Sequence, residues 1–247
     1  MAGVLLEKPT NEKMDSEEVD QEVTSYNHYH RRRFAFIKKI MGNCSGKNML
    51  EFGAWGVKAY FEENGASVDT IGIYDKRASA EKHYELNFST LPNGFPVIDK
   101  KYDVVLCCEV IEHLPVSMDT MFEFLNSLVK MGGNLLIQTP NAVSLKNRMA
   151  MLMGKNPFPL IDKTAIHYHN HIREYTLPEL IRIAENNGFA VVQKFRKNYF
   201  DYSHSMKARL YEVMGYCLPA SLKDGITILL KKINEKPVLN EIIYHKP

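Results

Sequence analysis

A run of five apolar residues that leads directly into ionisable side chains constrains the fold of this chain more than any other feature. Residues 104–108 are continuously apolar, which is typical of a strand buried on both faces of a parallel sheet. Glu109, Glu112 and His113 follow immediately. Because the carboxyl ends of such strands face a ligand crevice, we expect these three side chains to share one face of a turn or short helix beside a ligand. Such a face could bind a metal or move a proton.

Strand-like and helix-like segments alternate along the chain. The expected strands are residues 48–52, 68–74, 85–88, 104–108, 134–138, 189–195 and 226–230. The expected helices are residues 24–41, 78–84, 117–131 and 177–187. This order predicts an α/β fold with a doubly wound, mostly parallel sheet, whose last two strands pair as neighbours at the sheet edge. A helical cap precedes the first strand, and insertions follow the later strands.

The length of the chain suits one domain with additions. Residues 25–247 are expected to form this single domain, because 247 residues can bury one sizeable α/β core. Residues 1–24 are acidic and polar, and they are either a flexible segment or a helix that begins at Ser16. Residues 142–171 and 199–222 interrupt the alternation. They are expected to be insertions, the first of them a lid over the strand ends.

The boundaries of one helix can be predicted from its end residues. Thr176 and Glu179 have the spacing of a capping box, and Pro178 lies in the first turn. Gly188 follows the last residue of the apolar pattern, as is common at helix ends. The sequence therefore predicts a helix from about Leu177 to Asn187.

A glycine-containing turn follows the first expected strand. Gly53 and Gly56 would let backbone N–H groups approach a ligand closely, and the helical stretch that follows would offer its amino terminus to an anion. The next strand ends at Asp75, where a carboxylate can accept hydrogen bonds from ribose hydroxyls. An aspartate in a loop is more often a turn residue, so both roles stay open for Asp75.

Aromatic, imidazole and guanidinium groups gather in residues 26–33 of the first expected helix. A cap over a ligand site would use such groups, because arginine recognises phosphate or carboxylate well when it is positioned. The competing interpretation is a solvated helix face. Both stay open at this point.

Composition excludes several classes of protein. A formal net charge of +2 and a pI near 8.2 predict no general attraction to nucleic acid or membranes. The four cysteines have neither the spacing of a disulfide framework nor that of a zinc site. No apolar run reaches eighteen residues, so we expect a cytoplasmic protein without stable membrane insertion. The sequence does not indicate an oligomeric state.

Five motifs together resemble the class I S-adenosylmethionine-dependent methyltransferases. They are residues 50–56, Asp75, residues 103–114, residues 132–141 and residues 171–176. The resemblance spans about residues 46–196. It is nearest to small-molecule O-methyltransferases of the ubiquinone-biosynthesis type and to those that act on sugars or glycans, and it implies a Rossmann-like fold with S-adenosylmethionine as cofactor.

The resemblance also implies roles for individual residues around that cofactor. Gly53 and Gly56 would line its methionine end, Asp75 would hold the ribose, and Glu109 would lie beneath the sulfonium. The full implied set is Glu51, Gly53, Gly56, Asp75, Glu85, Leu86 and Glu109, with Glu85 and Leu86 beside the adenine. Two departures from the family pattern are Trp55 near a usual glycine position and a spacing that puts Tyr74 in the ribose register.

A second resemblance concerns the Glu-x-x-Glu-His run. Small-RNA 3′-terminal 2′-O-methyltransferases carry a similar run with a downstream histidine, and these residues bind a divalent metal. The corresponding set here is Glu109, Glu112, His113 and His171, which suits Mg²⁺, Mn²⁺ or a later first-row ion. Two alternatives stay open: general-base catalysis by His113 or His171 alone, or acidic residues that merely complement a helix dipole.

These observations predict methyl transfer from S-adenosylmethionine to a hydroxyl of a small molecule, either a sugar or glycan or a quinol or phenol. One alternative is a ribose 2′-O-methyltransferase acting at the 3′ end of RNA, which the near-neutral charge makes less favoured. Another is a catalytically inactive binding or scaffold protein with the same fold.

Overall fold

The structure is a computed structural model of the full chain. It describes residues 16–53, 56–72, 83–86, 95–158, 171–199 and 218–235, of which 16–28 are described through the backbone alone. Asp75, Trp55, most of the 199–222 insertion and the two histidines at 167 and 169 lie outside these ranges.

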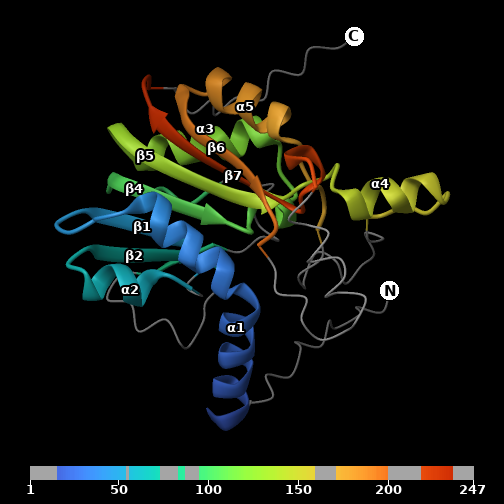
Figure 1. The fold of residues 1–247 in the computed structure, drawn as a ribbon. Coiled ribbons are helices and arrows are strands. Elements are labelled where there is room, and N and C mark those ends of the chain that lie inside the picture. The colour runs from blue at the N-terminus through green and yellow to red at the C-terminus, as the bar shows by residue number, and fades with distance from the viewer. Residues whose placement is uncertain are drawn as a thin grey trace, which may run out of the picture.

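Seven strands form one sheet in the order β3-β2-β1-β4-β5-β7-β6 (Figure 1). Their bounds are β1 Asn48–Phe52, β2 Ser67–Gly72, β3 His83–Glu85, β4 Tyr102–Cys108, β5 Val129–Pro140, β6 Phe189–Lys197 and β7 Gly225–Lys232. The first five strands pair in parallel, whereas β7 runs antiparallel to both β5 and β6. The predicted mostly parallel α/β fold and the pairing of the last two strands are therefore confirmed.

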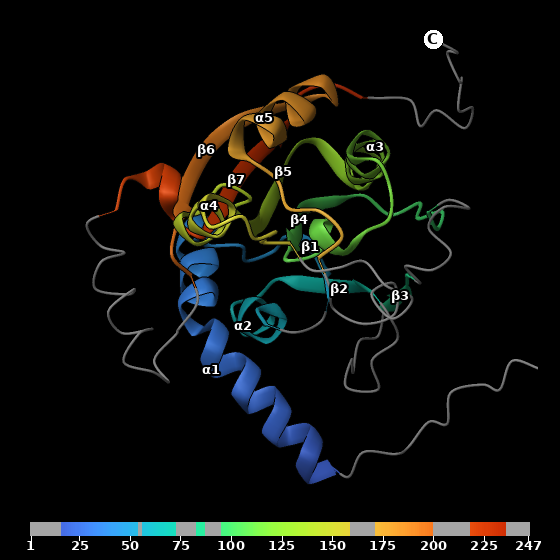
Figure 2. The same cartoon turned by 90° about the vertical axis from the view of Figure 1, so that its right-hand side faces the viewer.

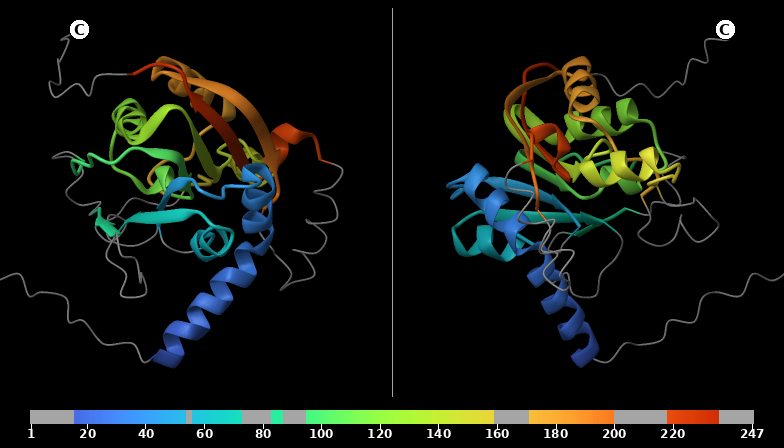
Figure 3. Two further views of the ribbon diagram at one scale, coloured as in Figure 1. Left: turned by 90° about the vertical axis from the view of Figure 1, so that its left-hand side faces the viewer. Right: turned by 45° about the vertical axis from the view of Figure 1, so that its right-hand side comes forward.

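Helices cover both faces of this sheet (Figure 3). The α-helices are α1 Ser16–Met41, α2 Lys58–Glu63, α3 Met118–Leu128, α4 Leu145–Leu152 and α5 Leu177–Asn186. Apolar residues of α1 and α2 form one core cluster with alternate residues of β4, such as Val104 and Leu106. Val105 and Cys107 point into the other cluster with α3 and α5. The run at 104–108 is thus buried on both faces, as predicted.

The predicted helix over residues 117–131 is too long. Ser117 caps α3 by accepting a hydrogen bond from the backbone N–H of Thr120, but α3 ends at Leu128 and β5 begins at the next residue. Gly132 and Gly133 therefore lie inside a strand and do not end the helix. The cause is tertiary pairing of Val129 with Tyr102, which the local glycine signal does not reveal.

Other boundaries also differ from the expectation. The first helix begins at Ser16 and not at residue 24, so residues 16–24 are helical, as the alternative interpretation had it. The predicted helix over 78–84 is wrong at its end, because His83 and Tyr84 pair with β2 as part of β3. Residues 78–82 and 87–88 lie outside the described part.

The helix predicted to begin after Thr176 is confirmed. Thr176 and Glu179 form both hydrogen bonds of the capping box, and α5 ends at Asn186, just before Gly188. Within the expected lid, the described residues include α4, while residues 159–170 lie outside them. In the part of the chain that was described, no helix is long and apolar enough to cross a membrane.

Candidate functional site

The candidate site lies where β4 ends. Glu109 follows β4 with a left-handed backbone (φ 56°), and its N–H donates to the carbonyl of Gln138 at 2.7 Å. A 3₁₀ turn, Ile111–His113, comes next. Within this turn Glu112 is fully buried and accepts a hydrogen bond from the hydroxyl of Thr139 at 3.0 Å.

Two segments 58 residues apart bring their histidines together at this turn. The rings of His113 and His171 meet edge to face, with centroids 4.9 Å apart. One ligand atom from each of them and one from Glu112 all lie within 4.8 Å of one another. The carbonyl of Glu112 also accepts hydrogen bonds from the N–H groups of Ile172 and Arg173, which fixes the later segment against the turn.

Glu109 does not belong to this group. Its carboxylate points toward α1, where Oε1 lies 4.0 Å from a guanidinium nitrogen of Arg33. Of the four residues proposed as metal ligands, the structure therefore brings together Glu112, His113 and His171 and leaves Glu109 outside that group. That Glu109, Glu112 and His113 share one face stays a prediction. The 3₁₀ helix begins only at Ile111, and the carboxyl of Glu109 interacts electrostatically with Glu112 and His171 as well as with Arg33.

Two residues that the sequence reasoning missed hold His171. Nδ1 of His171 lies 3.0 Å from Oε1 of Glu174. The amide of Asn147, from α4, donates to the other oxygen of Glu174 at 3.0 Å. The spacing of His171 and Glu174 within the same motif was a usable signal for the first contact. The second joins segments that no local pattern connects.

Burial dominates the electrostatics of the carboxylates. Loss of solvent raises the pKa of Glu109 to about 8, with further upward pressure from the neighbouring Glu112 and a partial opposing effect from Arg33. The pKa of Glu112 rises to about 7 for the same first reason, although the hydrogen bond from Thr139 and the charge of Arg33 oppose the rise. Carboxyl groups poised near neutrality in a crevice are candidates for chemistry.

Helix α1 contributes Arg33 to this environment. The guanidinium is almost fully buried and lies over the ring of Phe34. Burial and the nearby Arg33 together lower the pKa of His30 to about 3. The arginine-rich stretch therefore does not form a solvated face at this position, and the interpretation as a cap fits Arg33.

The glycine-containing turn lies beside the same strand ends. Glu51, near the end of β1, is buried, and Oε1 accepts from the N–H of Val57 at 3.3 Å. Gly53 has a left-handed backbone (φ 73°). A Cβ atom on Gly56 would lie 2.1 Å from the ring of Phe34, so α1 packs directly on the turn.

The remaining residues of the implied cofactor set lie farther along the sheet. Glu85 ends β3 and is exposed, whereas Leu86 is buried and donates its N–H to the carbonyl of Gly72 at 2.7 Å. Asp75 lies outside the described residues.

Comparison with known proteins places this geometry in a family. A model of the methyltransferase domain matches residues 26–194. The chain is 25% identical over 186 residues to a ubiquinone biosynthesis O-methyltransferase of Aeromonas salmonicida, covering 71% of this chain and 76% of that one. For the enzyme of the same description from Nitrosomonas europaea the identity is 25% over 165 residues, covering 62% and 68%.

Solved structures agree on the fold. An S-adenosylmethionine-dependent methyltransferase from Mesorhizobium loti superposes with a TM-score of 0.58 at 11% identity, covering 80% of this chain and 96% of that one. Another from Archaeoglobus fulgidus gives 0.55 at 17% identity, covering 88% and 100%. With the domain match extending over most of the chain, this protein belongs to the methyltransferase-domain family and is a class I S-adenosylmethionine-dependent methyltransferase.

Proposed function

We propose that this enzyme methylates a hydroxyl group of a small molecule, either a sugar or glycan or a quinol or phenol. The observation that carries the proposal is the group of Glu112, His113 and His171 at the end of β4. A hydroxyl must lose its proton to become a good nucleophile near neutral pH, and an imidazole is suited to accept it. The curated relatives named above are O-methyltransferases.

The described residues fit a cofactor at the glycine turn. Among the described residues, Oε2 of Glu51 is buried and has no hydrogen-bond partner, so we expect it to accept from a donor on a ligand. Gly53 supplies a left-handed turn beside it. We assign cofactor binding to Glu51, Gly53, Gly56, Asp75, Glu85, Leu86 and Glu109. Bound S-adenosylmethionine supplies a methyl group on positively charged sulfur.

His113 and His171 are the proposed catalytic residues. Nδ1 of His171 is within hydrogen-bond distance of Oε1 of Glu174. Nε2 of that ring is then left to accept the proton of the acceptor hydroxyl. Such an arrangement fixes the tautomer and orientation of an imidazole. A positioned base of this kind contributes roughly 10² to 10⁴-fold to a rate, and the placement of the acceptor within attack distance supplies a further share.

The same three residues fit a divalent cation. They offer one carboxylate oxygen and two imidazole nitrogens that lie within 4.8 Å of one another, and among the described residues Oε1 of Glu112 is buried and has no hydrogen-bond partner. This mixed donor set suits Mg²⁺, Mn²⁺ or a later first-row ion. A bound cation would lower the pKa of a coordinated hydroxyl. Glu109, on the Arg33 side, is the fourth proposed ligand only if its carboxylate turns inward.

The substitutions His113→Ala and His171→Ala test the assignment. Each should lower kcat by roughly 10² to 10⁴-fold on a quinol, catechol or sugar acceptor, while calorimetry should give an unchanged Kd for S-adenosylmethionine. Glu185→Ala, at an exposed position on α5, is the control. Full turnover in both histidine variants would rule out their catalytic role, and absence of cofactor binding in the unmodified enzyme would favour the inactive scaffold.

A chelator separates the two modes of proton removal. If a cation is required, dialysis against EDTA should abolish turnover and Mg²⁺, Mn²⁺ or Zn²⁺ should restore it. Turnover that survives EDTA while still depending on both histidines would assign the proton directly to an imidazole. An RNA with a free 3′-terminal ribose belongs in the same acceptor panel, because the Glu-x-x-Glu-His run is shared with enzymes that act there.

A further inference from the structure

The tip of α4 carries an unusual concentration of exposed apolar side chains. Eight large apolar side chains are exposed among the described residues, and four of them lie within residues 149–153. Leu152 is 80% exposed and Met153 is 62% exposed, and Met149 and Met151 are each about half exposed. Soluble proteins rarely present such side chains as a contiguous group unless the group contacts a partner or a membrane.

The charges around this apolar tip all have one sign. Lys146, Arg148 and Lys155 are exposed, and residues 142–158 contain no aspartate or glutamate. Nε of Arg148 donates to the carbonyl of Val143 at 2.8 Å, which holds this side chain along the helix. An apolar tip with a collar of basic side chains has the composition of segments that rest on anionic lipid surfaces.

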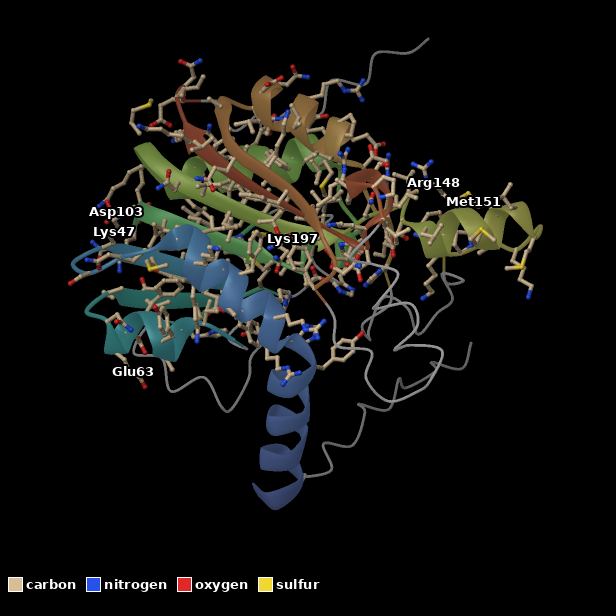
Figure 4. The ribbon with its side chains drawn as sticks, viewed as in Figure 1. Lys47, Glu63, Asp103, Arg148, Met151 and Lys197 are labelled. Atoms are coloured by element: carbon tan, nitrogen blue, oxygen red, sulfur yellow. The ribbon has the colours of Figure 1, made fainter. Side chains whose placement is uncertain are left out.

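The position of α4 in the fold leaves this tip free of the sheet. In Figure 1, α4 extends outward from the side toward which the parallel strands point, and Figure 4 places Arg148 and Met151 on this projecting helix. Viewed from that side in Figure 2, α4 lies in front of the strand ends. The other end of α4 reaches the candidate site, since Asn147 bonds to Glu174.

We propose that residues 146–155 form a docking surface for an anionic lipid bilayer, with the side chains of residues 149–153 entering the headgroup region and the three basic residues contacting lipid phosphates. A second copy of this chain fits the tip less well, because two such tips would bring six positive charges together. Docking by α4 would hold the candidate site next to the bilayer surface. This inference goes beyond the proposed function and does not rest on it, since lipid binding needs neither acceptor nor cofactor.

Co-sedimentation of the 247-residue chain with vesicles tests the proposal. The protein should sediment with vesicles of equal parts phosphatidylcholine and phosphatidylglycerol, should do so less at high salt, and should stay in solution with phosphatidylcholine alone. The double variant Leu152→Ser/Met153→Ser should bind at least about tenfold more weakly. Lys146→Gln/Lys155→Gln should lose about fivefold per residue.

A matched control replaces exposed apolar residues elsewhere. Val192 on β6 and Ile233 after β7 are about half exposed, and Val192→Ser/Ile233→Ser should bind anionic vesicles like the unmodified protein. Circular dichroism and the thermal midpoint should match in all variants, since every changed side chain is exposed. Failure of the unmodified protein to bind anionic vesicles, or equal binding by the Leu152/Met153 variant, would overturn the proposal. If the unmodified protein is a dimer that does not bind vesicles, and the Leu152/Met153 variant is a monomer, the tip would instead contact a second copy of the chain.

Discussion

The Glu51 carboxyl is costly to ionise because it is buried. Loss of solvent raises its pKa from an ordinary value of 4.5 to about 7, and backbone N–H groups of the glycine turn offset only part of the rise. The folded protein therefore holds this proton more tightly than the unfolded chain does. The resulting penalty is absent below pH 4.5, grows as the pH rises, and is complete above about pH 7.

Removing this charge should change the pH dependence of stability. The free energy of unfolding of Glu51→Gln, minus that of the unmodified protein, should increase by about 3 kcal/mol as the pH is raised from 4.5 to 7.5. Urea denaturation without cofactor, at a series of pH values, measures the difference. Glu63→Gln, at an exposed position of α2, should run parallel to the unmodified protein. If the free energy of unfolding of Glu51→Gln depends on pH in the same way as that of the unmodified protein, ionisation of Glu51 does not destabilise the folded state.

At the scale of single residues, the sequence indicates those parts of the site that adjoin a strand end or share a motif. Glu112 and His113 follow the apolar run directly, and the motif likeness added His171. Sequence reasoning missed Asn147, because its role depends on how α4 packs against a segment 27 residues later. It also did not predict that Glu109, which has a left-handed backbone, lies 4.0 Å from Arg33 of α1, because that approach depends on how α1 packs.

Among the elements, α1 and the glycine turn form one packed unit. Phe34 fills the space where a Cβ of residue 56 would lie, so the glycine is required there by a close approach. Gly56→Ala should destabilise the protein by about 1–3 kcal/mol through overpacking. In a Phe34→Leu background the ring is absent, and the same substitution should cost about 1 kcal/mol less.

Urea denaturation of the two single variants and the double variant gives this coupling energy directly. Gly72→Ala is a suitable comparison, because its Cβ would meet the nearest atoms at 3.6 Å, an ordinary contact. It should therefore be tolerated better than Gly56→Ala. Additive effects of Gly56→Ala and Phe34→Leu would contradict direct packing between the turn and α1.

Elements with strong local signals were predictable, and those set by tertiary pairing were not. The capping box at Thr176 defined the start of α5, and the apolar run defined β4. The end of α3 was missed because Val129 joins β5 by pairing with Tyr102, where the register shifts. The helix predicted over residues 78–84 included His83 and Tyr84, which are in a strand for the same reason: they pair with Thr70 and Ile71 of β2.

For the whole molecule, one buried lysine joins the last strand to the middle of the chain. Nζ of Lys232 donates to the carbonyls of Asn126 and Val129 at 2.6 and 2.9 Å, and it pairs with Glu235 at 2.7 Å. These carbonyls lie where α3 passes into β5, so the ammonium satisfies backbone groups at a helix end. The antiparallel strand β7 is thereby tied to the parallel half of the sheet.

Lys232→Met should keep most of the side-chain volume but leave two carbonyls without their donor. Hydrogen bonds to charged groups contribute about 1.5–3 kcal/mol each, and unsatisfied buried acceptors carry a similar cost, so the free energy of unfolding should fall by about 3 kcal/mol. Lys231→Met provides the matched control, because the neighbouring lysine is exposed on the opposite side of β7. Equal stability of the two variants in urea would mean that water replaces the ammonium. If only Lys232→Met lowers the free energy of unfolding, the hydrogen bonds of Lys232 to Asn126 and Val129 stabilise the packing of β7 against the α3–β5 junction.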